Sequence, residues 1–468
     1  MREGLKFGDF LVVIPGLGGS VLSSPGGPLW EPSRRLAGSL LKDRHDVLER
    51  LGGDPEKLDD PEHDDGVVAT GLIRSPVAIP GLASTNQYRS LTAALTGSFE
   101  LVRGDPLVDG PPANYFEFAY DWRRDNRISA ARLKELVDRE LPKWRSVLPY
   151  GEPRTVLVCH SMGGLVAKYY LDVLGGWRHC RALVTFGTPF RGAPKALNVL
   201  ANGFTACGAE IGAVSALLRR FTSVHQLLPR YPMVRDEHGQ VRRVHEFDTD
   251  LGELKISRAQ AAYQDFHRAL GTPERYRSRL RPLIGYGHRT AQSAVVRGGT
   301  VLVGDQVVTD NASLRAMNTG DGTVPEVSAM PVELTDSPWW WHNGKHSSMH
   351  TKKDVLDNLV RTLTPFTDLG DLQNPGSADQ GAPRPDRAAL DVRLAEVHAQ
   401  GDPVAVDCVL DDPAVTDPPS LTTSENVTVE RTETSEGHRF MLRGLPVGAH
   451  EVTVDWAGCS VTDVFEVC

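Results

Sequence analysis

The stretch VLVCHSMGG at residues 156–164 decides the fold that this sequence predicts. Its first half is apolar and rich in valine, which is typical of a buried strand. Ser161 follows directly, and Gly163 and Gly164 are small enough for a tight strand-to-helix turn. Residues 162–174 have helical spacing, so Ser161 stands at a helix N-terminus, where the dipole favours developing negative charge. A serine can merely cap a helix, but strand, turn and glycine pair together favour a nucleophile.

The rest of the chain fits an α/β-hydrolase fold, in which this turn is the nucleophile elbow. One departure is Cys159, which stands where a glycine is usual. Apolar strand patterns alternate with helical spacing, and this alternation predicts a mostly parallel sheet covered by helices. The expected strands are residues 9–14, 116–120, 154–159, 182–186, 283–285 and 293–303, and the expected helices are 128–148 and 162–174.

The sequence predicts two domains of unequal size. Residues 1–373 form the α/β-hydrolase domain, and an insertion at about 195–282 is expected to form a helical cap over the active site. Residues 374–386 have the composition of a linker. Residues 387–468 carry short alternating segments, which predict a small C-terminal all-β domain resembling a sandwich.

Composition excludes several classes of protein. The chain has 468 residues, of which 40% are hydrophobic and 24% charged, as in ordinary globular proteins. A formal net charge of −9 argues against a nucleic-acid partner. No apolar run approaches the ~20 residues of a transmembrane helix, and no secretory signal is recognisable, so a cytoplasmic location is expected.

The Gly-rich turn PGLGG at residues 15–19 is expected to form part of an oxyanion hole. Such a hole needs two backbone N–H donors, one after the nucleophile and one in the loop after an early strand. Met162 and Leu17 occupy these positions. The turn alone also fits a phosphate loop, but it lacks the lysine and spacing of a P-loop.

A nucleophilic serine requires a histidine base and an acid, in the chain order Ser, acid, His for this fold. Asp321 lies in the Gly-flanked stretch NTGDGTVP, residues 318–325. Three candidate bases follow, and their spacing leaves the choice open: His342, His346 and His350. Asp121 is a rival acid, but it precedes Ser161, which argues against it.

Several motifs together resemble the lecithin:cholesterol acyltransferase family, which includes phospholipid:diacylglycerol acyltransferases and phospholipases A. They are PGLGGSVL (15–22), FAYDWRR (118–124), CHSMGGLVAKYYL (159–171), FGTPFRGAPKAL (186–197), IGYGHRT (284–290), GDGTVP (320–325) and KHSSM (345–349). The resemblance implies Ser161 as nucleophile, Asp321 as acid and His346 as base, with Leu17 and Met162 at the oxyanion hole. The family's disulfide-closed lid loop has no counterpart, because no cysteine precedes Cys159.

The expected reaction is acyl transfer from a lipid or other long-chain ester through an acyl-enzyme, to water or to a second alcohol. No metal or organic cofactor is needed for this chemistry. Trp122 and Trp341 are candidate substrate-binding residues; Trp341 could form an apolar wall for an acyl chain, although packing in the core or cap is the favoured explanation of Trp341. Transient contact with a membrane surface is also expected of such an enzyme.

Two alternatives concern the domain at residues 387–468. In the first alternative, the hydrolase domain is an inactive scaffold, and the β domain binds an unknown protein or glycan. In the second, the cap or the β domain holds a phospholipase latent. An intact set of serine, acid and histidine argues against a dead scaffold, since the fold requires none of the three.

Overall fold

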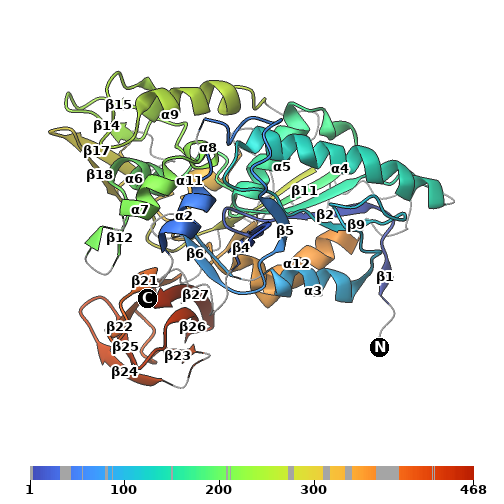
Figure 1. Ribbon diagram of the computed structural model, residues 1–468. Helices are drawn as coiled ribbons and strands as arrows, with labels where there is room; N and C mark the ends of the chain where they lie inside the picture. Colours follow the sequence, from blue (N-terminus) through green and yellow to red (C-terminus); the bar gives the residue numbers. More distant parts are fainter. Residues whose placement is uncertain are drawn as a thin grey trace.

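We describe the protein from a computed structural model (Figure 1). The described residues are 4–31, 44–54, 56–79, 83–86, 88–148, 151–206, 209–210, 212–271, 279–308, 317–331, 340–364, 389–423, 425 and 427–467. Within them the central sheet has six strands, all parallel. In spatial order they are β19 (Trp340–His342), β16 (Leu280–Gly285), β11 (Cys180–Phe186), β10 (Thr155–His160), β2 (Phe10–Ile14) and β9 (Tyr115–Glu117).

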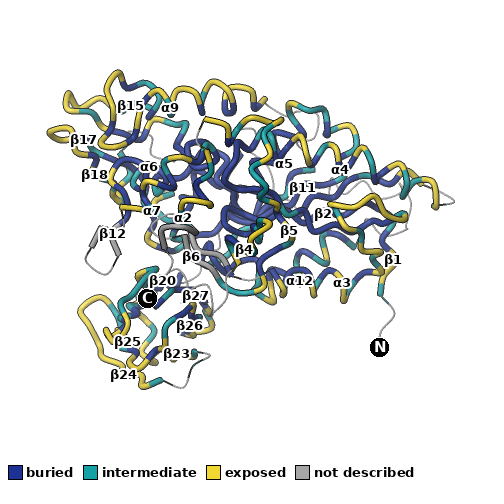
Figure 2. Tube along the Cα trace, viewed as in Figure 1, coloured by how far each residue is buried: buried dark blue, intermediate teal, exposed yellow. Residues whose placement is uncertain are grey.

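Helices cover both faces of this sheet, as parallel strands require. Side chains alternate between the faces, so Val12 belongs to one apolar cluster and Val13 to the other. The first face packs on α4 (Asn126–Val147) and α5 (Met162–Asp172). The opposite face packs on α3 (Arg89–Ser98) and α12 (Lys353–Leu363) (Figure 1). The α/β-hydrolase fold is thereby confirmed, and Figure 2 shows its strands as the most deeply buried part of the chain.

Several short strands and one short helix near the N-terminus lie outside the predicted elements. They connect or flank the strands of the hydrolase core and bring Trp30 against Trp122. These elements are β1 (Leu5–Lys6), β3 (Ser20–Ser24), β4 (Gly27–Trp30), α2 (Arg44–Gly52), β5 (Val68–Leu72), β6 (Val77–Ile79), β7 (Ala83–Thr85) and β8 (Phe99–Glu100). β3 pairs antiparallel with β4 and β5, as does β6 with β7, whereas β1 and β8 pair in parallel.

The insertion expected at 195–282 contains helices, but it also contains strands. Its helices are α6 (Pro194–Asn202), α7 (Gly212–Leu218), α8 (Thr222–His225) and α9 (Ile256–Ala262), with a 3-10 turn at Val244–Glu246 and a π-helical turn at Tyr263–His267. A further 3-10 turn, Gly176–Arg178, lies before the insertion, between α5 and β11. Its strands are β12 (Thr205–Ala206), β13 (Ala209–Glu210), β14 (Val234–Arg235) and β15 (Val241–Arg242).

The prediction that residues 293–303 rejoin the central sheet is wrong. They form a hairpin of β17 (Ser293–Arg297) and β18 (Thr300–Gly304), turned at Gly298 and Gly299. The hairpin instead pairs with the insertion, in the order β15-β14-β17-β18. An apolar alternation identifies a strand, but it does not identify the strand's partner.

The C-terminal domain consists of two four-stranded sheets around one apolar cluster, as expected of a small sandwich. One sheet holds β20 (Leu390–Leu394), β22 (Val404–Leu410), β25 (His438–Arg443) and β24 (Thr428–Glu433). The other holds β21 (Val397–His398), β27 (Cys459–Val467), β26 (Gly448–Trp456) and β23 (Ser420–Thr423). Residues 374–386, the expected linker, lie outside the described residues.

The remaining short helices are α11 (Glu326–Ala329) and the 3-10 turn Met349–Thr351, which flank the acid and base loops treated below. Among the helices described, none is both long and apolar enough for a membrane crossing.

Candidate active site

Ser161 occupies the sharp turn between β10 and α5, as the sequence predicts. Its φ of 51° and ψ of −126° are rare for a residue with a side chain, so the backbone is strained at this position. The turn is held by hydrogen bonds from Ser161 N–H to the Phe186 carbonyl (2.9 Å) and from the Thr188 hydroxyl to the Ser161 carbonyl (2.9 Å). A Cβ at Gly163 would lie 2.3 Å from the Pro15 carbonyl oxygen, so the close approach of the β2 loop requires glycine there.

The side chains of Ser161, His346 and Asp321 form a hydrogen-bonded series. His346 Nε2 lies 2.8 Å from Ser161 Oγ, and His346 Nδ1 lies 2.8 Å from Asp321 Oδ2. Because Nδ1 faces a carboxylate, the neutral His346 ring carries its proton on Nδ1. Nε2 is then free to accept a hydrogen bond from the Ser161 hydroxyl. All three are buried, with side chains on Ser161, His346 and Asp321 exposed by 7%, 2% and 1% respectively.

The acid loop lies between β16 and β19 and orients its carboxylate with backbone donors. Asp321 Oδ1 accepts hydrogen bonds from the N–H groups of Thr323 (2.9 Å) and Val324 (2.7 Å). The His346 N–H donates to the Asp321 carbonyl at 2.9 Å, so the acid and base loops are also joined through their backbones. Functional side chains thus follow the carboxyl ends of β10, β16 and β19, where parallel sheets place their sites.

Of the three candidate histidines, the structure brings only His346 to Ser161 and Asp321. His342 Nδ1 lies 3.4 Å from Asp354 Oδ2, and this contact lowers the pKa of Asp354 to about 2. His350 stacks on Tyr88 with ring centroids 4.8 Å apart and bonds to the Asn86 carbonyl at 3.2 Å. Burial lowers the pKa of His350 to about 3, so its ring is neutral.

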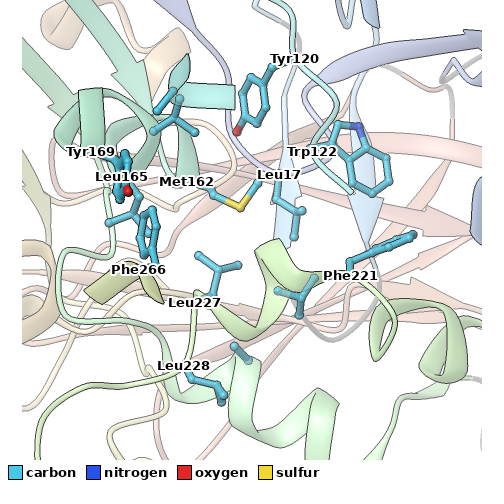
Figure 3. Packing of buried hydrophobic residues seen from close by; sticks show 14 of the residues in the cluster. Leu17, Tyr120, Trp122, Met162, Leu165, Tyr169, Phe221, Leu227, Leu228 and Phe266 are labelled. Carbon is cyan, nitrogen blue, oxygen red and sulfur yellow. The ribbon is translucent and has the colours of Figure 1, made fainter. Parts of the chain in front are cut away.

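The two residues expected at the oxyanion hole flank Ser161. Met162 is the first residue of α5, so its N–H has no acceptor within the helix. In the part of the chain described here, no hydrogen bond occupies the Leu17 N–H either. Figure 3 shows the side chains of Leu17 and Met162 pointing toward one another, with Leu227 of the insertion facing them. Leu227 of the insertion therefore packs in the same apolar cluster as the two residues expected at the oxyanion hole.

The structure also contains a polar relay behind the nucleophile that sequence reasoning missed. The Tyr88 hydroxyl accepts a hydrogen bond from the Gly16 N–H at 2.9 Å and lies 2.8 Å from His160 Nδ1. His160 Nε2 lies 3.0 Å from the His346 carbonyl. Since a carbonyl only accepts, the proton is on Nε2, and Tyr88 donates to Nδ1. His160 stands next to Ser161 in the sequence, but nothing near Tyr88 signals its part in the site.

Both candidate substrate-binding tryptophans pack against other aromatic rings. Trp122 is fully buried, donates to the Ser20 carbonyl (3.2 Å) and meets Phe221 edge to face. Trp341 is half-buried and meets Tyr286 edge to face at 6.1 Å. Their binding role stays a prediction. Among the described residues, no group of three or more His, Cys, Asp and Glu side chains is arranged to hold a metal ion.

Fold and geometry together define an α/β-hydrolase with a hydrogen-bonded serine, histidine and aspartate at the carboxyl edge of its sheet. Residues 111–296 match the family model described as lecithin:cholesterol acyltransferase. This match confirms the resemblance to that family which the motifs indicated.

Comparison with known proteins identifies related segments. The chain is 31% identical over 131 residues to the lysosomal phospholipase A and acyltransferase of Homo sapiens, covering 26% of this chain and 28% of that protein. It is 30% identical over 123 residues to lecithin-cholesterol acyltransferase-like 4 of Arabidopsis thaliana, covering 25% and 22%. The matched segments thus span about a quarter of these relatives. The crystal structure of the mature Bacillus licheniformis lipase BlEst2 aligns with 78% of this chain and 95% of its own, at 12% identity and a TM-score of 0.33.

Proposed function

We propose that this protein is a serine hydrolase or acyltransferase of lipid esters. The observation that carries the proposal is the unbroken hydrogen-bonded series from Asp321 through His346 to Ser161, whose strained backbone is typical of a nucleophile elbow. The family match over residues 111–296 supports lipid esters as the substrate class. Two of the related proteins support the same substrate class by their names. One is a lysosomal phospholipase A and acyltransferase, and the other is lecithin-cholesterol acyltransferase-like 4.

The proposed reaction proceeds in two halves. His346 Nε2 removes the proton of Ser161 as its Oγ attacks the ester carbonyl, and Asp321 stabilises the imidazolium that forms. The N–H groups of Leu17 and Met162 then stabilise the negative oxygen of the tetrahedral intermediate. Collapse of the intermediate breaks the ester C–O bond, His346 protonates the leaving alcohol, and an acyl-enzyme remains.

The second half repeats these steps with a new nucleophile. Water yields a free fatty acid, whereas an alcohol yields a new ester, and both restore the Ser161 hydroxyl. The proposal includes the cap: Leu227 of the insertion shares an apolar cluster with Leu17 and Met162, and such a surface beside the oxyanion hole suits an acyl chain. No step uses a metal or an organic cofactor. Contact with a lipid surface and a cytoplasmic location belong to the same proposal.

Covalent labelling tests the proposed nucleophile directly. A fluorophosphonate probe is expected to modify wild-type protein at Ser161 and to leave Ser161→Ala unlabelled. Ester hydrolysis by that variant is expected to fall by about 10⁴-fold or more. Ser146→Ala is the matched control, because Ser146 is an exposed serine on α4 whose hydroxyl bonds only to its own helix. Unlabelled wild-type protein would favour an inactive scaffold that acts through its β domain.

The acceptor is tested by supplying mixed phospholipids with and without a sterol or diacylglycerol. New sterol ester or triacylglycerol that depends on Ser161 would identify a transferase, and free fatty acid alone would identify a hydrolase.

A further inference from the structure

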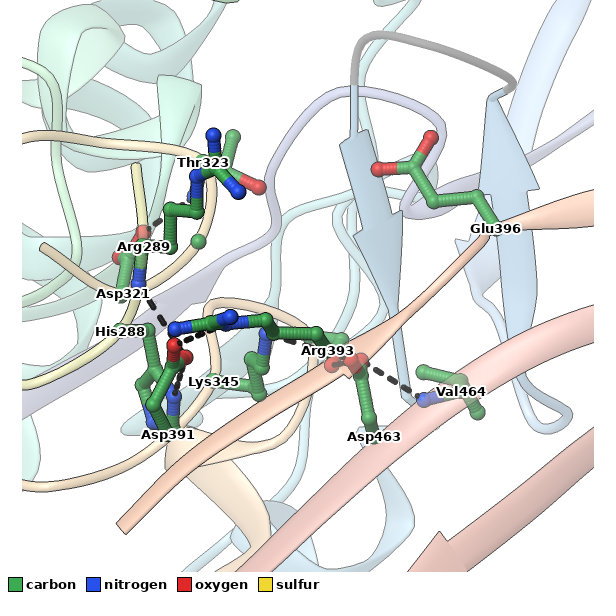
Figure 4. A network of polar contacts seen from close by, with 12 residues as sticks. His288, Arg289, Asp321, Thr323, Lys345, Asp391, Arg393, Glu396, Asp463 and Val464 are labelled. Carbon is green, nitrogen blue, oxygen red and sulfur yellow. Dashed lines mark hydrogen bonds and ion pairs between the residues drawn. The ribbon is translucent and has the colours of Figure 1, made fainter. Parts of the chain in front are cut away.

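The loop that carries His346 is held from outside the hydrolase domain. The side chains of both its chain neighbours, Lys345 and Ser347, turn toward the C-terminal domain. Ser347 Oγ donates to Asp463 Oδ1 at 3.0 Å, and Lys345 Nζ lies 3.6 Å from Asp463 Oδ2. Asp463 belongs to β27, and Figure 4 shows its carboxylate between Lys345 and Val464. One carboxylate of the β domain thus contacts the residues immediately before and after the proposed base.

Further hydrogen bonds connect the β domain to the same loop. Ser348, which is fully buried, donates from its hydroxyl to the Thr462 carbonyl at 2.6 Å. Asn343 exchanges two hydrogen bonds with the backbone of Leu390 on β20, at 3.0 Å and 3.3 Å. The loop is therefore anchored to the β domain at both ends and on each side of His346.

The β domain also contacts the loop that carries the acid. Asp391 accepts a hydrogen bond from the Arg289 N–H at 3.2 Å and lies 3.4 Å from His288 Nδ1 (Figure 4). The backbone of His288 pairs with Gly320 in both directions, at 3.0 Å and 3.1 Å. Gly320 directly precedes Asp321. Asp391 of the β domain is therefore connected to the acid through His288 and Gly320.

The contacts between the β domain and these loops are buried, and several involve charged groups. Buried polar and charged side chains are costly without their partners, so these contacts favour one arrangement of the loops. Ser347 and Asp463 are both buried, with 1% and 8% of the residue surface exposed. Burial by itself would raise the pKa of Asp391, but hydrogen bonding to His288 and the charge of Lys345 lower that pKa well below its usual value. A buried carboxylate that loses its partner is costly, which favours the docked arrangement over a loose one.

We propose that the C-terminal β domain is part of the active site's positioning machinery, with Asp463 as the residue that sets the place of the His346 loop through Ser347 and Lys345. The inference rests on the proposed function and extends it. On this proposal the enzyme needs the β domain to reach its full catalytic rate. The β domain is then neither a stabilising appendage, nor a separate binding module, nor an inhibitor of the enzyme.

The test compares Asp463→Ala and Ser347→Ala with the wild type in the full chain. Asp407→Ala is the matched control, because Asp407 lies in the same domain but pairs with Arg439 on an exposed face. Hydrolysis of p-nitrophenyl butyrate gives kcat and KM, fluorophosphonate labelling gives the reactivity of Ser161, and thermal unfolding reports on the fold.

Both variants are expected to lower kcat and the labelling rate by roughly 10- to 100-fold, the effect of a small misplacement of a catalytic group, with KM within about twofold. The double variant is expected to be no slower than the slower single variant, since both remove the same contact. Thermal midpoints close to that of Asp407→Ala would separate positioning from unfolding. If Asp463→Ala unfolds, Ser347→Ala, which removes a single oxygen, gives the same comparison.

Two outcomes would overturn the proposal, and they are distinguishable. Active wild type with folded Ser347→Ala and Asp463→Ala variants as fast as Asp407→Ala would remove the positioning role and leave the proposed function intact. Wild type that is neither labelled nor active would remove the proposed function, and this inference with it.

Discussion

The Tyr88 hydroxyl lies 2.8 Å from Nδ1 of His160, the residue that directly precedes the proposed nucleophile. The same oxygen accepts the Gly16 N–H, so a single phenol joins the oxyanion loop to the nucleophile turn. The other ring nitrogen of His160, Nε2, donates a hydrogen bond to the His346 carbonyl. Burial, with the nearby His350 and His346 rings, lowers the pKa of His160 well below its usual value, so the ring stays neutral and keeps this arrangement of donors and acceptors.

Removal of the Tyr88 hydroxyl should therefore slow ester turnover. Tyr88→Phe leaves the Gly16 N–H without its acceptor and His160 Nδ1 without its donor, and we expect kcat to fall by about tenfold or more because the oxyanion loop loosens. Tyr170→Phe is the control: Tyr170 is equally buried, but its hydroxyl has no hydrogen-bond partner among the described residues. Steady-state kinetics of both variants check the prediction, which fails if the two behave alike.

Gly187 occupies a position that cannot accept a side chain without disturbing the site. Its φ is 56°, and a Cβ there would lie 2.8 Å from Asp321 Oδ2 and 2.9 Å from His346 Nδ1. Gly187→Ala should reduce kcat by about 100-fold, since the methyl group separates acid from base. Gly298→Ala has the same φ of 56° but meets nothing within 4 Å, so it tests backbone strain alone. Comparable losses in the two variants would contradict the prediction.

Acid should destabilise the fold through buried histidines. Burial lowers the pKa of His225 to about 4, and that of His267 and His350 to about 3. In the unfolded chain these groups take up protons below pH ~6.5 that the folded chain refuses, so stability falls as pH drops from about 6.5 toward 4. Each group contributes up to about 1.4 kcal/mol per pH unit.

Urea unfolding across this pH range measures the slope. His267→Leu removes one of these titrating groups, so its stability curve should be flatter than that of the wild type. Parallel curves for the two proteins would show that His267 takes up no proton on unfolding.

Arg123 should contribute strongly to stability. Its guanidinium is fully buried, bonds to both carboxylate oxygens of Asp121 (2.9 Å and 2.7 Å) and reaches Asp65 at 2.7 Å. Arg123→Ala would leave a buried carboxylate unpaired, at an expected cost of about 3–5 kcal/mol in the free energy of unfolding. Asp121 therefore has a structural partner, in agreement with its place before Ser161 in the chain.

Arg439→Ala is the comparison for this prediction. Arg439 makes a similar two-oxygen contact with Asp407, but its side chain is 47% exposed, so the loss should be within about 1 kcal/mol. Chemical denaturation measures both values, and equal losses would contradict the role assigned to burial.

The parts of the site that could be predicted are those written in short stretches of sequence. The Ser161 turn was predicted because strand, serine and glycines lie within nine consecutive positions, residues 156–164. Asp321 followed from the chain order and its Gly-flanked turn, whereas the choice of His346 required the family resemblance, since three histidines fall between 342 and 350 and spacing does not separate them. Their convergence depends on the pairing of β19 with β16, a long-range contact that local patterns do not encode.

What could not be predicted depends on contacts between distant segments. Tyr88 is 72 residues from His160, and no motif surrounds it. Asp463 is 116 residues from Ser347, and its own strand pattern indicates only a sandwich strand. The hairpin at 293–303 was assigned to the wrong sheet for a related reason, because the identity of a neighbouring strand is a property of the fold and not of the strand.

The distance of 116 residues between Ser347 and Asp463 has a consequence for biosynthesis. At about 5–20 residues per second, a ribosome needs roughly 6 to 23 seconds after adding Ser347 before Asp463 is made. Until then the growing polypeptide has its nucleophile but lacks the strand that sets the base loop. On the proposed role of Asp463, we expect the growing polypeptide to react roughly 10- to 100-fold more slowly than the finished chain until β27 has been added.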